Sequence, residues 1–232
     1  MKLIEDREQL QNYLQVHQIE SVFNEALLAH LSLYSFDEGE IICEQGDLQY
    51  HLYILVKGKI KIFMNSSEGH KLIIAFKSPL EIVGDIEFIQ NIELINTVEA
   101  VTPVYMIGIH YDWLNKYGMN YPPLMQFLLK IITRKFRIKD NSFSFNMMYP
   151  VEVRLASYLM SISFDESNTN FKGRLSIKNL KDAAGLIGTS YRHLNRVINQ
   201  LCAEGLIERN KEYINVIDRK GLSLLANDNI YE

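Results

Sequence analysis

GTSYRHLNRVINQL, residues 188–201, is the stretch that decides the fold of the C-terminal part of the chain. Its apolar residues recur at the spacing of one helix face, which predicts an amphipathic helix. The predicted inner face consists of Leu194, Val197, Ile198 and Leu201. The opposite face carries polar and basic side chains, namely Tyr191, Arg192, Asn195, Arg196 and Asn199.

A second, shorter helix is predicted just before this one, over residues 179–187. Gly188 follows it, and glycine is the usual residue just beyond a helix end. Thr189 or Ser190 can then cap the next helix by accepting a backbone N–H bond. A short helix, a turn that contains glycine and a second helix together predict a helix-turn-helix.

The second helix of this motif enters the major groove of DNA with its N-terminal residues at the base edges. Arginine pairs bidentately with guanine, and asparagine with adenine. Hydroxyl groups at the helix start suit phosphate contacts. The candidate DNA-contacting residues of this stretch are Thr189, Ser190, Tyr191, Arg192, His193, Asn195 and Arg196.

A β-hairpin is predicted after the second helix, over residues 206–216, with a polar turn near Asn210. A hairpin in this place makes the motif a winged helix. Arg209 and Lys211 at the predicted tip, and Lys178 before the first helix, are expected to lie near the phosphate backbone.

The charge distribution supports this reading. The formal net charge of the chain is −4, but residues 170–221 carry 10 Lys/Arg against 5 Asp/Glu, whereas residues 1–149 carry 13 against 18. The C-terminal part is thus a basic module attached to an acidic body.

Several classes of protein are not expected. No apolar run approaches the roughly 20 residues that span a bilayer, so no membrane partner is expected. The N-terminus lacks the apolar region of a signal peptide. Cys43 and Cys202 are far apart, and the sequence contains no Cys/His zinc spacing. The expected location is therefore the cytoplasm.

The N-terminal half changes texture near residue 32. Residues 3–31 show helical spacing of leucine, isoleucine and phenylalanine. Residues 33–109 contain short apolar or alternating runs separated by turn residues, which predicts a β-barrel or β-sandwich.

A long helix is predicted from Pro122 onward, because proline suits the first helical turn. Its apolar positions have spacings of 4, 3, 4 and 3, which form a heptad seam. Such a seam suits either a helix packed on the barrel or, as favoured here, a two-stranded dimer helix. The seam residues are Leu124, Leu128, Ile131, Lys135 and Ile138. Residues 141–150 are expected to be a linker.

The order of these parts resembles the CRP/FNR family of transcription regulators over nearly the whole chain. The motifs that carry the resemblance are FDEGEIICEQGD (36–47), LYILVKGKIKIF (52–63), EGHKLIIAF (68–76), EIVGDIEFI (81–89), RLASYLM (154–160) and GTSYRHLNRVINQLCAEGLIE (188–208). The SYRHL segment is most similar to the YeiL branch. Tyr191 and Arg192 stand where the common family pattern has Arg followed by Glu, so the operator half-site is expected to differ.

The resemblance implies an α+β fold in three parts. Residues 1–120 are expected to form an effector domain, a cyclic-nucleotide-binding-like β-roll of the jelly-roll type with N-terminal helices. Residues 121–145 are expected to form the dimerisation helix, and residues 146–232 a winged helix-turn-helix DNA-binding domain.

The resemblance also places an effector pocket in the β-roll. The residues that fall in the family's ligand cassette are Gly84, Asp85, Glu87, Asn96 and Thr97. No arginine lies between Arg7 and Arg134, and a buried phosphate without a guanidinium partner is poorly compensated. Cyclic AMP is therefore not expected, and the carboxylates favour a cationic or neutral ligand, or none.

Iron–sulfur and haem cofactors are not expected either. Two distant cysteines do not supply the four ligands of a cluster. The histidines are isolated in the sequence, which indicates surface or structural roles for His30, His51, His70 and His110.

Two other function classes compete with a DNA-binding regulator. A cupin-like barrel enzyme needs clustered metal ligands such as H-x-H, which the sequence lacks, so no enzyme is expected. A cyclic-nucleotide-binding regulatory module alone needs neither a winged helix nor a basic C-terminal part. The sequence therefore favours a homodimeric regulator of double-stranded DNA. The resemblance implies that it binds an inverted repeat and activates through RNA polymerase.

Overall fold

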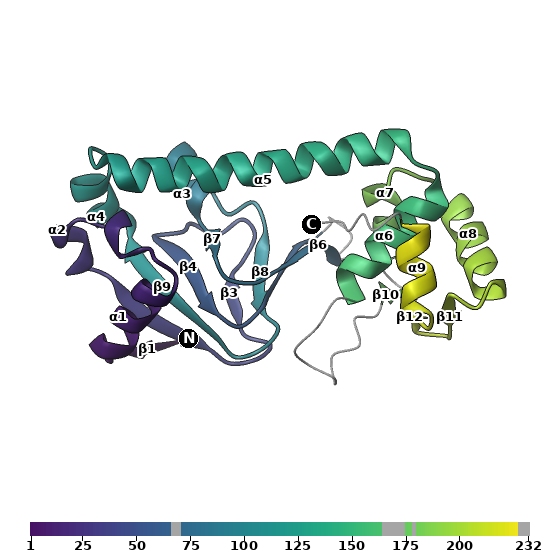
Figure 1. The fold of residues 1–232 in the computed structure, drawn as a ribbon, viewed down its shortest axis with the longest axis horizontal. Helices are drawn as coiled ribbons and strands as arrows, with labels where there is room; N and C mark the ends of the chain where they lie inside the picture. Colours follow the sequence, from purple (N-terminus) through teal and green to yellow (C-terminus); the bar gives the residue numbers. More distant parts are fainter. Residues whose placement is uncertain (66–70, 164–174, 178–179, 227–232) are drawn as a thin grey trace. The chain divides into compact units, whose positions relative to one another are not determined.

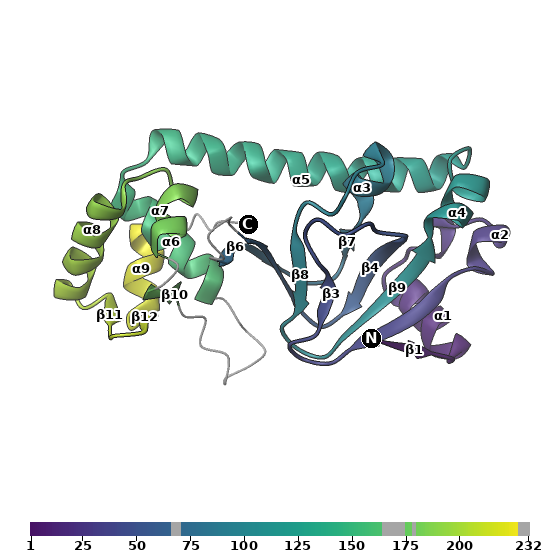
Figure 2. The same cartoon turned by 180° about the vertical axis from the view of Figure 1, so that it is seen from behind.

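A computed structural model describes residues 1–65, 71–163, 175–177 and 180–226 of the chain. The chain divides into two compact units (Figures 1 and 2). The first unit comprises Met1–Met64 and Phe76–Arg137, and the second Asn65–Ala75 and Ile138–Glu232. None of the described helices is both long and apolar enough to cross a membrane.

Two antiparallel sheets are built mainly from residues of the first unit. One sheet has the order β1 (Lys2–Ile4), β2 (Ser32–Phe36), β9 (Val104–His110), β4 (His51–Lys57) and β7 (Glu81–Val83). The other has the order β3 (Ile41–Cys43), β8 (Thr97–Ala100), β5 (Ile60–Asn65) and β6 (Lys71–Lys77). Strands far apart in sequence are neighbours, as β2 and β9 show, so the sheets form a roll rather than a simple meander. The predicted β-rich region is confirmed.

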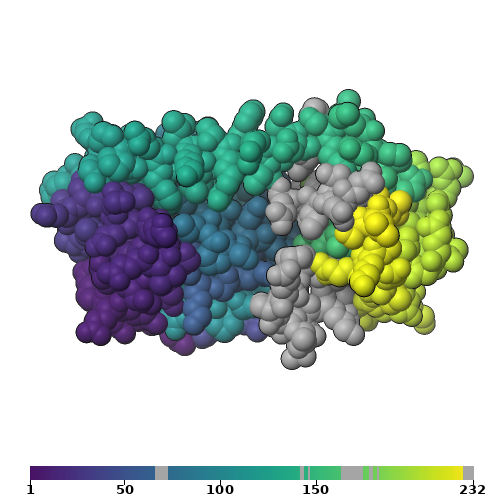
Figure 3. All heavy atoms as spheres, viewed as in Figure 1, coloured from purple at the N-terminus to yellow at the C-terminus, as the bar shows by residue number. Residues whose placement is uncertain are grey.

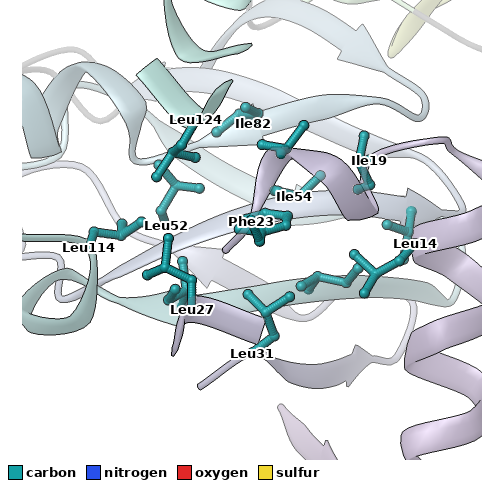
Figure 4. Close-up of a cluster of buried hydrophobic side chains, with 14 of the residues drawn as sticks. Leu14, Ile19, Phe23, Leu27, Leu31, Leu52, Ile54, Ile82, Leu114 and Leu124 are labelled. Atoms are coloured by element: carbon teal, nitrogen blue, oxygen red, sulfur yellow. The ribbon is translucent and has the colours of Figure 1, made fainter. Parts of the chain in front are cut away.

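Strand β4, which lies between β9 and β7, contributes side chains to two separate cores. Leu52, Ile54 and Val56 point to the helix-covered face of the sheet, and Figure 4 shows two of them against Phe23. Tyr53 and Leu55, which alternate with them, point into the space between the sheets. Successive side chains of a strand face opposite ways, so a strand covered on both faces is apolar throughout.

The N-terminal segment covers one face of the roll, and its residues form an outer surface in Figure 3. It contains α1 (Arg7–Val16), the 3-10 helix η1 (Glu20–Val22) and α2 (Glu25–Leu28). The expectation of helix from residue 3 is wrong at its start, because Leu3 lies in β1 and pairs with Tyr34. Helix α1 begins only after Asp6, whose carboxylate accepts a bond from the Gln9 amide at 2.8 Å.

Short helices α3 (Asp85–Gln90) and α4 (Tyr111–Trp113) and the π-helical turn η2 (Leu114–Gly118) precede the long helix α5 (Pro122–Met148). Helix α5 begins at the predicted proline. The expected linker is wrong for most of its length, since the helix continues to Met148. Pro150 follows, and its ring disfavours helix in the residue before it.

The heptad seam of α5 packs against the roll of the same chain. Leu124, Leu128 and Ile131 are at most 5% exposed and belong to the helix-covered core. Lys135 turns to the acidic side chains of β7 and α3, and Ile138 is half-buried. Leu124, Leu128 and Ile131 are therefore not available for the predicted contact with a second chain, while for Lys135 and Ile138 that contact stays a prediction. An apolar helix stripe shows that a face is buried, but not what buries it.

The second unit contains α6 (Val151–Ser163), α7 (Leu180–Leu186), α8 (Tyr191–Ala203) and α9 (Arg219–Leu225). Its small antiparallel sheet has the order β10 (Leu175–Ser176), β12 (Tyr213–Val216) and β11 (Ile207–Arg209). The two predicted helices and the hairpin are confirmed as α7, α8 and β11–β12. Strand β10 was not expected, because two residues carry no periodic pattern.

Candidate nucleic-acid interface

Helix α8 is strongly amphipathic. Its inner side chains Leu194, Val197, Ile198 and Leu201 are at most 1% exposed. Ser190 caps the helix, because its hydroxyl oxygen accepts a bond from the His193 amide at 3.2 Å. The predicted cap and the predicted buried face of this helix are therefore confirmed.

The outer side of α8 presents most of the candidate DNA-contacting residues to solvent. Tyr191 is 43% exposed, and Arg192 and Arg196 are exposed one helical turn apart. Ser190 is exposed as well, whereas Thr189, His193 and Asn195 are half-buried. Arg192 and Arg196 thus place positive charge on the exposed side of α8 near its N-terminus, where the helix dipole is also positive.

The turn before α8 is fixed by backbone and side-chain bonds. Gly188 has a φ of +66°, and the Thr189 amide donates to the Ala184 carbonyl at 2.8 Å. From α6, the Arg154 guanidinium donates to the carbonyls of Ile187 and Gly188, the second at 3.1 Å. Arg154 is only 8% exposed. It ties the turn to α6 and thereby sets where α8 begins.

Arg154 was not assigned a role from the sequence. The available signal was an arginine within an otherwise apolar helix face, since Val151, Leu155 and Ala156 beside it are buried. A buried arginine needs hydrogen-bond acceptors, but periodicity alone does not say that these are the carbonyls of a turn more than 30 residues later.

The hairpin forms a compact wing. Strands β11 and β12 pair with Ile207 opposite Val216 and Arg209 opposite Ile214. At the tip, the Asn210 side-chain oxygen accepts bonds from the Glu212 and Tyr213 amides at 2.8 and 2.7 Å. This Asx turn leaves Lys211 exposed at the end of the wing. Lys178, the other predicted phosphate contact, lies outside the described residues.

Arg209 joins the wing to α8. Its Nη1 donates to Oδ1 of Asn195 at 2.8 Å, while Nδ2 of Asn195 donates to the Tyr191 carbonyl at 2.9 Å. Both side chains are half-buried. The structure therefore brings together two residues that the sequence assigned separately, one to a base and one to a phosphate.

Comparison with known proteins identifies both units. Residues 33–120 match the family model of the cyclic nucleotide-binding domain, and residues 153–225 match the Crp-like helix-turn-helix domain. The chain belongs to the CRP/FNR family of transcription regulators. The matched helix-turn-helix contains α8, the wing and the Arg154 contact described above.

Two curated relatives show how far this similarity extends. The regulatory protein YeiL of Escherichia coli O157:H7 is 24% identical over 211 residues, which cover 89% of this chain and 93% of that protein. The CRP-like cAMP-activated global transcriptional regulator of Mycobacterium tuberculosis is 21% identical over 204 residues, or 87% and 91%. These CRP/FNR relatives are regulators rather than enzymes.

A solved structure shows the same fold. It is a putative transcriptional regulator of the CRP/FNR family from Eubacterium rectale, with 18% sequence identity and a TM-score of 0.69. The match covers 93% of this CRP/FNR chain and 99% of that chain. The α+β fold expected from the sequence is confirmed.

The candidate effector cassette is the second site of interest in this CRP/FNR chain. Gly84 has a φ of +88°, and its carbonyl accepts a bond from the Tyr111 hydroxyl at 2.8 Å. Glu87 is 8% exposed and accepts a bond from the Ile95 amide at 3.2 Å. These bonds hold the cassette backbone against its neighbours.

The remaining cassette residues are Asp85, Asn96 and Thr97. Asp85 and Thr97 are each 2% exposed, and Asn96 is half-buried. The Thr97 hydroxyl oxygen accepts a bond from the Gln45 amide at 3.1 Å. Gly84, Glu87 and Thr97 of the cassette thus accept hydrogen bonds from other residues of the same chain.

A cation reaches the cassette from α5, which the sequence did not indicate. The Lys135 ammonium lies 2.9 Å from Asp85 and 3.1 Å from Glu81, and Arg134 donates to the Leu80 carbonyl at 3.0 Å. The absence of arginine between Arg7 and Arg134 therefore does not leave the carboxylates without a cation. The overlooked signal was Lys135 itself, a charged residue in an apolar seam.

Two of the histidines that are isolated in the sequence lie next to each other in the fold, and their surface or structural role stays a prediction. His51 and His110 face each other across β4 and β9, with ring centroids 5.0 Å apart. The pKa of His51 lies below its usual range, mainly because the ring is partly buried and to a smaller extent because of the charge of His110. His30 stacks on Trp113 at 3.6 Å, and His70 lies outside the described residues. Strand pairing, rather than sequence proximity, creates the histidine pair.

Among the described residues, no group of three or more His, Cys, Asp or Glu side chains could hold a metal ion. Burial raises the pKa of the Cys43 thiol to about 12, which disfavours the thiolate that binds metals.

Proposed function

We propose that this CRP/FNR chain acts as a homodimer that binds an inverted-repeat operator, with α8 of each protomer in a major groove. The observation that carries the proposal is the exposed row of Tyr191, Arg192 and Arg196 on a helix whose other face is fully buried. Such a helix keeps its place in the protein while its outer side chains contact base edges. Two-fold symmetry then predicts half-sites about 34–36 Å apart.

Arg192 and Arg196 are the proposed base readers. Each exposed guanidinium suits a bidentate contact with guanine O6 and N7, which discriminates by roughly 1–3 kcal/mol. Tyr191 and His193, at the same end of α8, are proposed to contact the bases or sugars beside them. This arrangement makes the first turn of α8 the main determinant of operator sequence.

The proposed phosphate contacts surround these base readers. Thr189 and Ser190 lie at the α8 N-terminus, where backbone N–H groups attract anions. Lys211 projects from the wing tip, and Lys178 is assigned from the sequence alone. These contacts position the protein and make affinity fall with rising salt.

Asn195 and Arg209 are proposed to position the wing rather than to contact DNA independently. The 2.8 Å bond between them fixes the Asn195 amide, whose other end already bonds the Tyr191 carbonyl. A charge-assisted bond of this length is a strong link in a half-buried place. The pair then holds Lys211 at a constant distance from α8.

The proposed dimer contact is the outer side of α5. Leu129 and Phe136 are 62% and 71% exposed, and they lie seven residues apart with the half-buried Ile132 between them. These three residues occupy a and d positions of a heptad that the β-roll leaves uncovered. They replace Leu124, Leu128 and Ile131, which the roll buries.

A randomised-operator selection with purified protein tests the DNA-binding proposal. The wild-type chain should enrich an inverted repeat. Arg196→Ala should cost about 1–3 kcal/mol of binding and lose preference at one base position of each half-site. Asn195→Ala, the matched variant on the same helix face, should weaken all sites about equally. Failure of the wild-type chain to enrich any sequence contradicts the proposal.

Activation through RNA polymerase, in the cytoplasm, is the expected outcome of operator binding. Transcription in vitro from a promoter that carries the selected site tests this part separately. An increase in transcript that requires the site supports an activator, and a decrease supports a repressor.

A further inference from the structure

A buried acidic pair, made of the cassette residue Asp85 and of Glu81 in the preceding strand β7, already holds a cation. Glu81 is 3% exposed and Asp85 is 2% exposed, at the start of β7 and of α3. The Lys135 ammonium lies 2.9 and 3.0 Å from the two oxygens of Asp85 and 3.1 Å from Glu81 Oε1. It also donates to the Ile82 carbonyl at 2.7 Å. A buried carboxylate needs such a partner, because isolated charge is costly away from water.

The cation comes from outside the matched nucleotide-binding domain. That domain ends at residue 120, whereas Lys135 lies in α5, 50 residues from Asp85. Its side chain is 22% exposed, so part of the lysine remains in contact with solvent. Lys135 follows Leu124, Leu128 and Ile131 at heptad spacing, on the side of α5 whose apolar residues belong to the core.

We infer that Glu81, the Ile82 carbonyl and Asp85 form a binding site for a primary ammonium group, and that Lys135 is its resident occupant. An –NH₃⁺ group has three N–H donors, and the site offers hydrogen-bond acceptors for them, namely two carboxylates and a carbonyl around one nitrogen. Ionised carboxylates and a carbonyl only accept hydrogen bonds, so they suit the N–H donors of an ammonium and offer nothing to the acceptor oxygens of a phosphate. The site therefore selects a cation, and Lys135 fastens α5 to the roll without a separate ligand. This inference does not depend on DNA binding.

Chemical rescue of the full-length chain tests the site. Lys135→Ala removes the ammonium and leaves a space that propylammonium fits. Its melting midpoint should fall by about 5–15 °C, as expected when one partner of a buried ion pair is lost. Propylammonium should raise the midpoint of this variant in a saturable manner. It should leave wild type and the exposed-lysine control Lys130→Ala unchanged.

Three controls test whether the rescue depends on a charged amine that fills the vacated space. Propanol, which lacks the charge, and sodium chloride at matched ionic strength should not rescue Lys135→Ala. Lys135→Met, which fills the space without a charge, should stay destabilised and show no rescue. If Lys135→Met melts with the wild type, or if the salt rescues as well as the amine, the inference is wrong.

A charge-compensating variant covers the case in which Lys135→Ala does not fold. Glu81→Gln added to Lys135→Met removes one of the two stranded carboxylates, so the double variant should melt higher than Lys135→Met. No difference between them would contradict the site. Cyclic AMP provides a last comparison. A midpoint rise with cyclic AMP that Lys135→Ala abolishes would show that the lysine holds a phosphate, and would overturn the assignment.

Discussion

Replacing Phe136 with alanine should weaken dimerisation without unfolding the chain. The ring is 71% exposed in the single chain, so most of its surface is still available for burial against a partner. Full burial of a phenylalanine is worth roughly 1.5–3 kcal/mol, so this ring contributes about 1–2 kcal/mol. Two-fold symmetry doubles the effect to about 2–4 kcal/mol, or a rise of about 30- to 1000-fold in the dimer dissociation constant.

Sedimentation velocity over a concentration series measures that constant directly. Leu224→Ala is the matched control, because Leu224 is an apolar residue of α9 that is 74% exposed. Its truncation should leave the dimer unchanged. The helix-face reasoning is refuted if Phe136→Ala shifts the dissociation constant no more than Leu224→Ala does.

Two further substitutions separate stability from assembly. Leu128→Ala should destabilise the first unit by about 2–5 kcal/mol in denaturant unfolding, because Leu128 is 1% exposed in its core, and it should not alter the dimer constant once the chain is folded. A change in dimerisation without loss of stability would contradict the packing of α5 on the roll. Ser190→Ala removes the α8 cap and should cost about 1 kcal/mol in unfolding, whereas Ser190→Asp should retain the cap. Equal stability of all three proteins would show that the cap is not used.

The winged helix was the part most accessible from the sequence. Its helices are predicted by local signals, such as the apolar spacing from Leu194 to Leu201 and the glycine at 188. The hairpin follows from a polar turn between two short apolar runs. These features depend on residues only a few positions apart, so a single sequence suffices to find them.

The roll was predicted as a β-rich body but not as a specific sheet order. Pairing of β2 with β9 joins residues about 70 positions apart, and the facing of His51 and His110 follows from such pairing. The assignment of Leu124, Leu128 and Ile131 to the dimer contact failed for a related reason. Helix α5 has one apolar side for the roll and a second, shorter one that is exposed, and spacing alone does not distinguish them.

Contacts between distant polar groups were beyond the sequence altogether. Lys135 and Asp85, or Arg209 and Asn195, are recognisable as partners only after the fold has placed them within bonding distance. The sequence marked each of these residues as unusual or functional, but it did not indicate which of them bond to each other in the fold.

The Arg154 contact has a consequence for protein engineering. Two carbonyls of the turn before α8 receive their hydrogen bonds from α6, so the segment 180–203 does not contain everything that fixes its own geometry. Transplanting that segment alone into a foreign scaffold would remove the two Arg154 hydrogen bonds from the turn, and the orientation of α8 would change. A transplant that keeps the geometry has to carry an arginine that bonds the same two turn carbonyls, along with the exposed residues of α8.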